Sequence, residues 1–107
     1  MEGKITKGKI IVDGVLIDTE KTEIASACIL EVEVGTNGYQ GGDTGHGGRT
    51  FFRLENLACT DMLCEVEYDG QRNAKEIKIG FGGDCELECF IEALRFAWDR
   101  LMLKINY

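Results

Sequence analysis

A glycine-rich stretch holds the residues of this chain that are best suited to binding chemistry. Residues 35–50 read GTNGYQGGDTGHGGRT and contain seven of the fourteen glycines and the only histidine. Strand patterns lie on both sides, and ordering such a stretch costs conformational entropy. Connections this long within a compact domain are usually functional or disordered. We therefore predict a ligand site made of Asn37, Tyr39, Gln40, Gly41, Gly42, Asp43, Thr44, Gly45, His46, Gly47, Gly48 and Arg49.

These residue types suit a small anionic ligand such as a nucleotide. Glycines let backbone N–H groups turn inward to form an anion-binding nest, and the Arg49 guanidinium suits a phosphate or carboxylate. Tyr39 can stack on a base or sugar, while Asn37, Gln40 and Asp43 can bind polar edges. The phosphate motifs G-x-x-x-x-G-K-[ST] and G-x-G-x-x-G are absent, and no helix follows to add its dipole. A structural loop, with glycines for turns or close packing, is the alternative.

A catalytic role is a further alternative for the same stretch. His46 titrates near neutral pH, and Asp43, three residues earlier, could orient its imidazole. A hydrolase using Asp43 and His46 lacks a nucleophile within a recognisable signature, although Thr44 and Thr50 are near. We therefore predict a non-enzymatic binding protein without a cofactor: a carrier, a sensor or a sequestering protein. Phage-type ligand sponges share this general profile, by analogy only.

The cysteines offer a possible metal site. Cys59-x4-Cys64 and Cys85-x3-Cys89 supply four thiols in two pairs, and structural zinc sites use similar spacings. Free cysteines are more often buried as small apolar residues, and strand alternation points Cys64 into the core. Cys85 lies near a helix N-terminus, which lowers the pKa of a thiol, but acidic neighbours disfavour an activated nucleophile. We predict no bound metal.

Composition limits the classes of partner. A chain of 107 residues is enough for one domain, 1–107. The net charge of −7 argues against binding long nucleic acid or an anionic membrane. No signal peptide pattern is present and no apolar run approaches the length of a membrane span. We therefore expect a cytoplasmic protein, in which five cysteines, an odd number, are free thiols rather than a disulfide set.

Periodicity predicts an α+β fold: an antiparallel sheet of about six strands, a meander with an N-terminal hairpin, followed by one C-terminal amphipathic helix packed on the sheet. Asp13-Gly14 between β-branched residues is a strong hairpin signal. We expect a polar turn over 18–21 and a long alternating strand over 23–34. Further strands are predicted over 50–57, 62–68 and 77–81. Two acidic rows, one of Glu31 and Glu33 and one of Glu65, Glu67 and Asp69, suit a cation site, but such rows are more often the solvated face of a sheet.

The helix is predicted over 85–103, with Asp84 as its N-cap. Its apolar stripe has helical spacing and contains Leu87, Phe90, Ile91, Leu94, Trp98, Leu101 and Ile105. Four more residues extend the stripe beyond what one sheet face requires: Cys89, Ala93, Phe96 and Ala97. A helix that is apolar over most of its girth is deeply buried or shared with another subunit. We therefore expect a homodimer, through the helix or a sheet edge. The remaining alternative is a protein-interaction module whose glycine-rich loop is structural.

Overall fold

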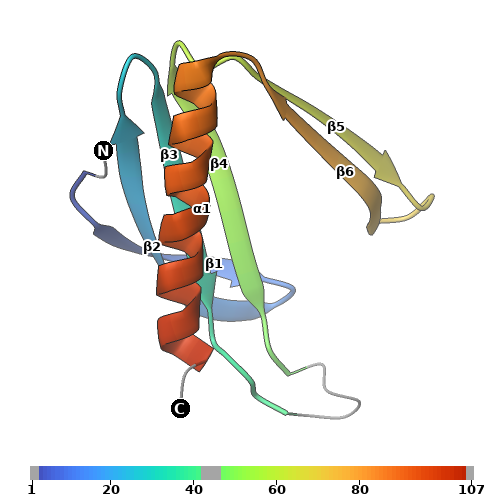
Figure 1. Ribbon diagram of the computed structural model, residues 1–107. Helices are drawn as coiled ribbons and strands as arrows, with labels where there is room; N and C mark the ends of the chain where they lie inside the picture. Colours follow the sequence, from blue (N-terminus) through green and yellow to red (C-terminus); the bar gives the residue numbers. More distant parts are fainter. Residues whose placement is uncertain (1–2, 42–46, 106–107) are drawn as a thin grey trace.

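The computed structural model describes residues 3–41 and 47–105 and has the predicted α+β class (Figure 1). In the described part, the elements follow in the order β1 (Thr6–Val12), β2 (Val15–Ala25), β3 (Ile29–Thr36), β4 (Thr50–Ala58), β5 (Met62–Tyr68), β6 (Ala74–Phe81) and α1 (Asp84–Ile105). The strands form two antiparallel sheets, one with the order β1-β2-β3-β4 and one of β5 and β6 alone. The prediction of a single six-stranded sheet is therefore wrong.

The chain leaves the main sheet at a tight bend after β4. Cys59 has a φ of 59°, in the left-handed region that few residues other than glycine adopt. The Asn56 side chain bridges the bend, because its Nδ2 donates to the Thr60 carbonyl at 2.6 Å and its Oδ1 accepts from the Thr60 N–H at 3.2 Å. The Thr60 hydroxyl donates to the Ile29 carbonyl of β3. This bend starts β5 in a new direction, so β5 does not pair with the edge of β4.

The N-terminal hairpin is confirmed, since Asp13 and Gly14 both have positive φ and Val12 pairs with Val15. The polar turn expected over 18–21 is wrong, because β2 continues through it. Its polar side chains have partners within the fold: the Thr19 hydroxyl donates to Glu33 at 2.6 Å. The single strand expected over 23–34 is also wrong, because bends at 26–28 divide it into β2 and β3.

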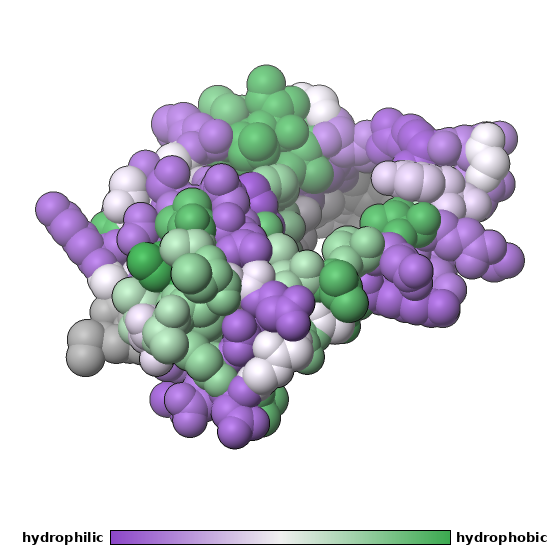
Figure 2. Space-filling model, turned by 90° about the horizontal axis from the view of Figure 1, so that it is seen from above, coloured by the Kyte–Doolittle hydropathy of each residue, from purple (hydrophilic) through white to green (hydrophobic). Residues whose placement is uncertain are grey.

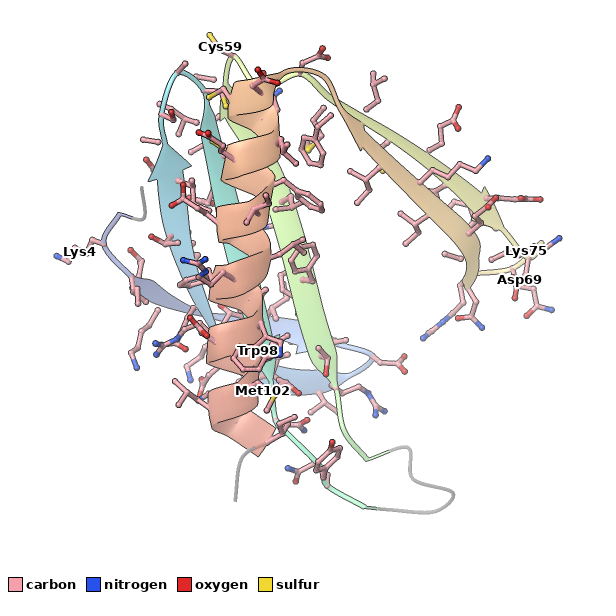
Figure 3. All side chains as sticks on the ribbon, in the orientation of Figure 1. Lys4, Cys59, Asp69, Lys75, Trp98 and Met102 are labelled. Carbon is pink, nitrogen blue, oxygen red and sulfur yellow. The ribbon has the colours of Figure 1, made fainter. Side chains whose placement is uncertain are left out.

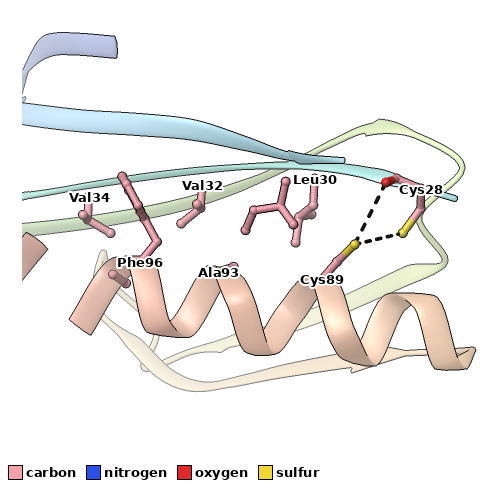
Figure 4. Close-up of a cluster of buried hydrophobic side chains, with 9 residues drawn as sticks. Cys28, Leu30, Val32, Val34, Cys89, Ala93 and Phe96 are labelled. Carbon is pink, nitrogen blue, oxygen red and sulfur yellow. Dashed lines mark hydrogen bonds between the residues drawn. The ribbon is translucent and has the colours of Figure 1, made fainter. Parts of the chain in front are cut away.

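Helix α1 covers one face of the main sheet and packs chiefly on β3 (Figures 1 and 4). The core between them consists of Ile24, Cys28, Leu30, Val32, Val34, Cys89, Ala93, Phe96 and Ala97. The Gly83 carbonyl accepts the first helical hydrogen bond, from the Leu87 N–H at 3.2 Å. Asp84 is therefore the first helical residue rather than the expected N-cap, still beside the positive end of the helix.

The helix presents a different face to the sheet from the one that its large residues suggest. Small side chains at positions 89, 93 and 97 face β3 together with Phe96, which allows the helix backbone to approach the strands closely. Most of the predicted stripe is exposed instead. We call the exposed residues of α1 that follow a 4-3-4 spacing the outer stripe: Leu87, Ile91, Leu94 and Trp98.

Ion pairs connect α1 to β2 and β4 to β3. Arg100 of α1 donates from Nε and from a terminal nitrogen to the two Glu20 carboxylate oxygens of β2, at 2.9 and 2.7 Å. The Arg53 guanidinium of β4 binds Glu31 and Glu33 of β3. The acidic row on β3 is thus balanced by a protein cation rather than arranged as a cation site.

The hairpin of β5 and β6, which we call the arm, projects from this body (Figures 1 and 3). Opposite pairs such as Val66 and Ile77 share an apolar face. At the base of the arm, Phe81 packs on Phe90 of α1 with ring centroids 4.6 Å apart. Further out the apolar face is exposed, and Cys64, expected in the core, is exposed as well. The radius of gyration of 15.1 Å exceeds the roughly 13 Å of a compact chain of about this length.

No helix in the described part of the chain combines the length and the apolar character needed to cross a membrane.

Candidate functional site

The glycine-rich loop connects β3 to β4, and hydrogen bonds close its neck. Thr36 and Thr50 form the last residue pair of the two strands, and their hydroxyl oxygens lie 2.9 Å apart. The Asn37 N–H donates to the Arg49 carbonyl at 3.2 Å, and Asn37 Oδ1 accepts from the Arg49 N–H at 2.7 Å. The Thr36 hydroxyl oxygen also accepts from the Gly38 N–H at 3.1 Å. We call the described segments 37–41 and 47–49 the two limbs of the loop. These hydrogen bonds hold the limbs together where they leave the sheet.

Glycine is required where the two limbs run side by side. The Gly47 N–H donates to the Gly41 carbonyl at 2.8 Å. A Cβ atom on Gly47 would lie 2.4 Å from that same carbonyl oxygen, and one on Gly48 would lie 2.6 Å from the Gly38 carbonyl oxygen. Gly38 and Gly41 have positive φ. Several glycines of the loop thus have a structural purpose as well as any role in binding.

A cavity of about 530 Å³ lies between the loop limbs and the C-terminal end of α1. Its lining combines hydroxyl, amide and aromatic groups of the loop with two aliphatic side chains of the helix: Thr36, Gly38, Tyr39, Gln40, Gly41, Gly48, Thr50, Leu101 and Ile105. The volume falls within the range of small-molecule pockets, which are typically apolar with a few polar groups.

A second cavity, of about 420 Å³, adjoins the first because Thr36 lines both. Two lysines, Lys9 and Lys104, contribute to its lining with Asn37. The Lys9 ammonium lies 2.7 Å from the Asp18 carboxylate. Asp18 also lines this second cavity, so two lysines and one carboxylate lie next to the first cavity. Within the described residues, no charged residue lines the first cavity itself.

The structure distributes the described residues of the predicted site over four places. Tyr39, Gln40, Gly41 and Gly48 line the first cavity, and Asn37 lines the second. The Arg49 side chain instead points to the tip of the first hairpin, where its Nε lies 3.7 Å from the Asp13 carboxylate. Gly47 belongs to the paired limbs. The remaining predicted residues lie outside the described part of the chain: Gly42, Asp43, Thr44, Gly45 and His46.

The helix and the strand ends also contribute to the cavity, which no sequence pattern indicated. Leu101 and Ile105 continue the 4-3 spacing of the outer stripe into the last turns of α1, where they line the cavity. That spacing was visible in the sequence, but nothing there indicated that the end of the helix lies beside the loop. Lys104 carried no signal beyond its place in the last helical turn.

No protein-family model matches this chain, and comparison with curated proteins and with solved structures found no similar protein.

Proposed function

We propose that this protein binds a small nucleotide-like ligand at the neck of the glycine-rich loop and does not transform it. The observation that carries this proposal is the cavity between the loop limbs and the end of α1. The hydrogen bonds that close the neck hold Thr36 and Thr50 in place, which supports a cavity whose base is formed without a ligand. Preformed sites avoid the cost of ordering a loop on binding.

The lining suits a ligand with a ring, hydroxyl groups and a negative charge. Tyr39 offers an aromatic face to a ring, and Leu101 supplies an aliphatic wall. The hydroxyl groups of Thr36 and Thr50 can donate to or accept from a sugar. The anionic part would extend into the adjoining cavity towards Lys104, because opposite charge there offsets the loss of solvation. This arrangement replaces Arg49 with Lys104 as the main anion contact.

The test combines native mass spectrometry with equilibrium binding. Extra mass of small-molecule size on freshly purified protein, recovered unchanged after release, would support binding without turnover; a product would favour the hydrolase of Asp43 and His46. With ADP and adenosine as probes, we expect ADP to bind more tightly. Lys104→Gln should remove most of that preference, whereas Lys75→Gln on the distant arm should not.

Two results would count against this proposal. One is equal binding of ADP and adenosine by every variant, which would remove the anion contact. The other is unchanged affinity in Tyr39→Ala with an unchanged melting temperature, which would place the ligand elsewhere.

A second function, self-association, is supported by the exposed apolar surface of α1 and the arm. The total accessible surface of 7312 Å² is about a fifth larger than the roughly 5,950 Å² expected for a folded monomer of 11.9 kDa. Figure 2 shows a hollow between the body and the projecting arm, with apolar atoms at its rim. We propose that a second copy of the chain covers this surface.

The pattern of these residues favours a second copy as the partner. The outer stripe repeats the 4-3 spacing with which helices pack against helices. A two-stranded hairpin alone is marginally stable in water, so the arm needs a surface on which to pack. In a two-fold dimer the same patch serves on both subunits, and the excess surface of about 1,360 Å² is more than the roughly 800 Å² per partner that a standard interface buries.

A matched pair of variants on the arm tests this second proposal. Ile77 lies on the apolar face of β6, whereas Leu63 lies on the opposite face of β5 and is the more exposed, at 69% against 59%. Ile77→Asp should convert a dimer to a monomer in sedimentation velocity, and Leu63→Asp should not. A wild-type protein that sediments as a monomer at high concentration would contradict self-association.

A further inference from the structure

Three cysteines from distant parts of the sequence meet at the N-terminal end of α1. The Cys28 sulfur lies 3.3 Å from the Cys85 sulfur and 3.4 Å from the Cys89 sulfur, and all three sulfur atoms lie within 4.8 Å of one another. Cys28 and Cys89 are buried, while Cys85 is half-buried. The group therefore has a closed side in the core and an open side towards solvent.

Two local structures position the three thiols. Cys85 and Cys89 are separated by one helical turn, so their side chains share the face of α1 that packs on the sheet. Cys28 ends the bend between β2 and β3, where its carbonyl accepts from the Ser26 N–H at 2.9 Å. Figure 4 shows Cys28 and Cys89 directed towards each other across the helix–sheet interface.

The separations are too long for a disulfide and are close to those of thiolates that share a metal ion. A disulfide requires sulfur atoms about 2.05 Å apart. Thiolates on a tetrahedral zinc ion, with Zn–S bonds of about 2.3 Å, lie roughly 3.8 Å apart. The two separations from Cys28 would open by about 0.4–0.5 Å to reach that value, and all three sulfur atoms already lie within 4.8 Å of one another.

The surroundings of Cys85 favour its charged form. The Ser26 side chain, Cys28, and the backbone at Cys28 and Ala27 together lower the pKa of the Cys85 thiol. The first turn of α1 adds the positive end of the helix dipole. Burial raises the pKa of the Cys28 thiol and raises that of the Cys89 thiol to about 12, so a bound ion would have to displace both protons.

We propose that Cys28, Cys85 and Cys89 bind one thiophilic d¹⁰ metal ion, with Zn²⁺ as the probe. The ion forms three metal–sulfur bonds and displaces three thiol protons to solvent, which leaves the zinc–thiolate group with a net charge of −1. The fourth coordination position faces the open side next to Cys85 and is available to water or to an outside ligand. Soft thiolates select such ions over magnesium or calcium.

This site differs from the one that the sequence spacing offered. Cys59 and Cys64 are exposed and take no part in it, whereas Cys28, which belongs to no spaced pair, completes it. It also lies at the opposite end of α1 from the proposed ligand cavity. Failure of either site therefore leaves the other intact.

The experiment measures metal binding by the full reduced chain under anaerobic conditions. Zn²⁺ affinity is determined by competition with a chromophoric chelator, and Co²⁺ reports thiolate ligation through its sulfur-to-metal charge-transfer absorption. We expect one ion per chain. Cys85→Ser should weaken binding by more than about 100-fold, because loss of even an outer-shell partner costs roughly 10- to 100-fold. Cys59→Ser and Cys64→Ser are matched controls that should bind as the wild type does.

Several results would overturn the proposal. These are the absence of charge-transfer absorption in the wild type, unchanged affinity in Cys85→Ser, or loss of binding in either control. Cys89→Ser places a hydroxyl in the core and could unfold the chain, so Cys85→Ser, at a half-buried position, is the deciding variant. The same variant should remove the rise in melting temperature that Zn²⁺ causes in the wild type.

Discussion

The main sheet and the arm are built from the same kind of sequence, but only one of them is covered. Val32 and Val34 alternate with glutamates in β3 and are buried beneath α1. Val66 and Ile77 alternate with charged residues in the arm in the same way, yet remain exposed. Alternation therefore shows which residues share a face of a sheet, but not what lies on that face.

The cause of the difference is the placement of the single helix in the described residues. Helix α1 runs along β3 and covers the main sheet, and its contact with the arm is at the base, where Phe81 meets Phe90. Its second apolar surface, the outer stripe, faces away from the sheet. The chain thus carries two uncovered apolar surfaces, the outer stripe and the apolar face of the arm. The corresponding face of the main sheet is covered by α1.

The largest test of this comparison replaces one apolar side chain in each region. Phe96→Ala should lower the free energy of unfolding by about 3–5 kcal/mol, because Phe96 is 2% exposed and its removal leaves a cavity. Ile77→Ala in the arm should change it by less than about 0.5 kcal/mol in the monomer. Urea denaturation at low protein concentration measures both. A large effect of Ile77→Ala there would show that the arm is packed within one chain.

The sequence predicted much of the fold because alternation and turn chemistry are local. The Asp13-Gly14 hairpin, the helix and the strands flanking the glycine-rich loop all followed from residues close together in the chain. The bends at 26–28 carried no glycine or proline, so two strands were read as one. The exit after β4 depends on Asn56 reaching over to Thr60, a contact that no periodicity reveals.

The candidate sites were less predictable because they join distant segments. The loop ends of the ligand cavity were identified from glycine content, but its helical wall, Leu101 and Ile105, was not. The cysteine group joins Cys28 to Cys85 and Cys89 across 57 and 61 residues. The large residues of α1 were assigned to the core, whereas the small residues Ala93 and Ala97 occupy it, because they permit the closer approach of helix and sheet.

A second test uses a position where the main sheet permits no side chain. A Cβ atom on Gly35 would lie 2.4 Å from the Asp18 carbonyl oxygen and 2.8 Å from the Thr19 methyl group. Gly35→Ala should therefore destabilise the chain by about 1–3 kcal/mol, the usual cost of overpacking. Thermal unfolding followed by circular dichroism measures this. An unchanged melting temperature would mean that β2 and β3 separate easily at this point.

A third test concerns the ion pair between Arg100 and Glu20, which fixes α1 to β2. Hydrogen bonding to Arg100 lowers the pKa of Glu20 below its usual 4.5. The stabilisation is therefore present above about pH 4.5 and is lost as the pH falls through the lower pKa of the folded state. Glu20→Gln should lower the free energy of unfolding by about 1–2 kcal/mol at pH 7, between the values for exposed and buried pairs. It should also reduce the loss of stability that the wild type shows as the pH falls below about 4.5.

The arm supplies the control for that third test. Its Glu67 lies 3.9 Å from Lys75, with both side chains exposed. Glu67→Gln should change the free energy of unfolding by less than about 0.5 kcal/mol, as most exposed pairs contribute little. Equal effects of the two substitutions, measured by urea denaturation between pH 3 and pH 7, would indicate a general charge effect rather than the specific Glu20 contact.

The smallest effect is expected at Gly80, the counterpart of Gly35 in the arm. No atom lies within 4 Å of a Cβ added there, and the residue does not have positive φ. Gly80→Ala should therefore stabilise the monomer by about 0.4–1 kcal/mol, because alanine reduces the entropy of the unfolded chain. If the dimer buries the opposite, apolar face of the arm, Gly80→Ala should leave the dimer dissociation constant unchanged. Weaker association in sedimentation equilibrium would instead mean that a partner approaches the Gly80 face, and the proposed interface would have to be moved to that side of the arm.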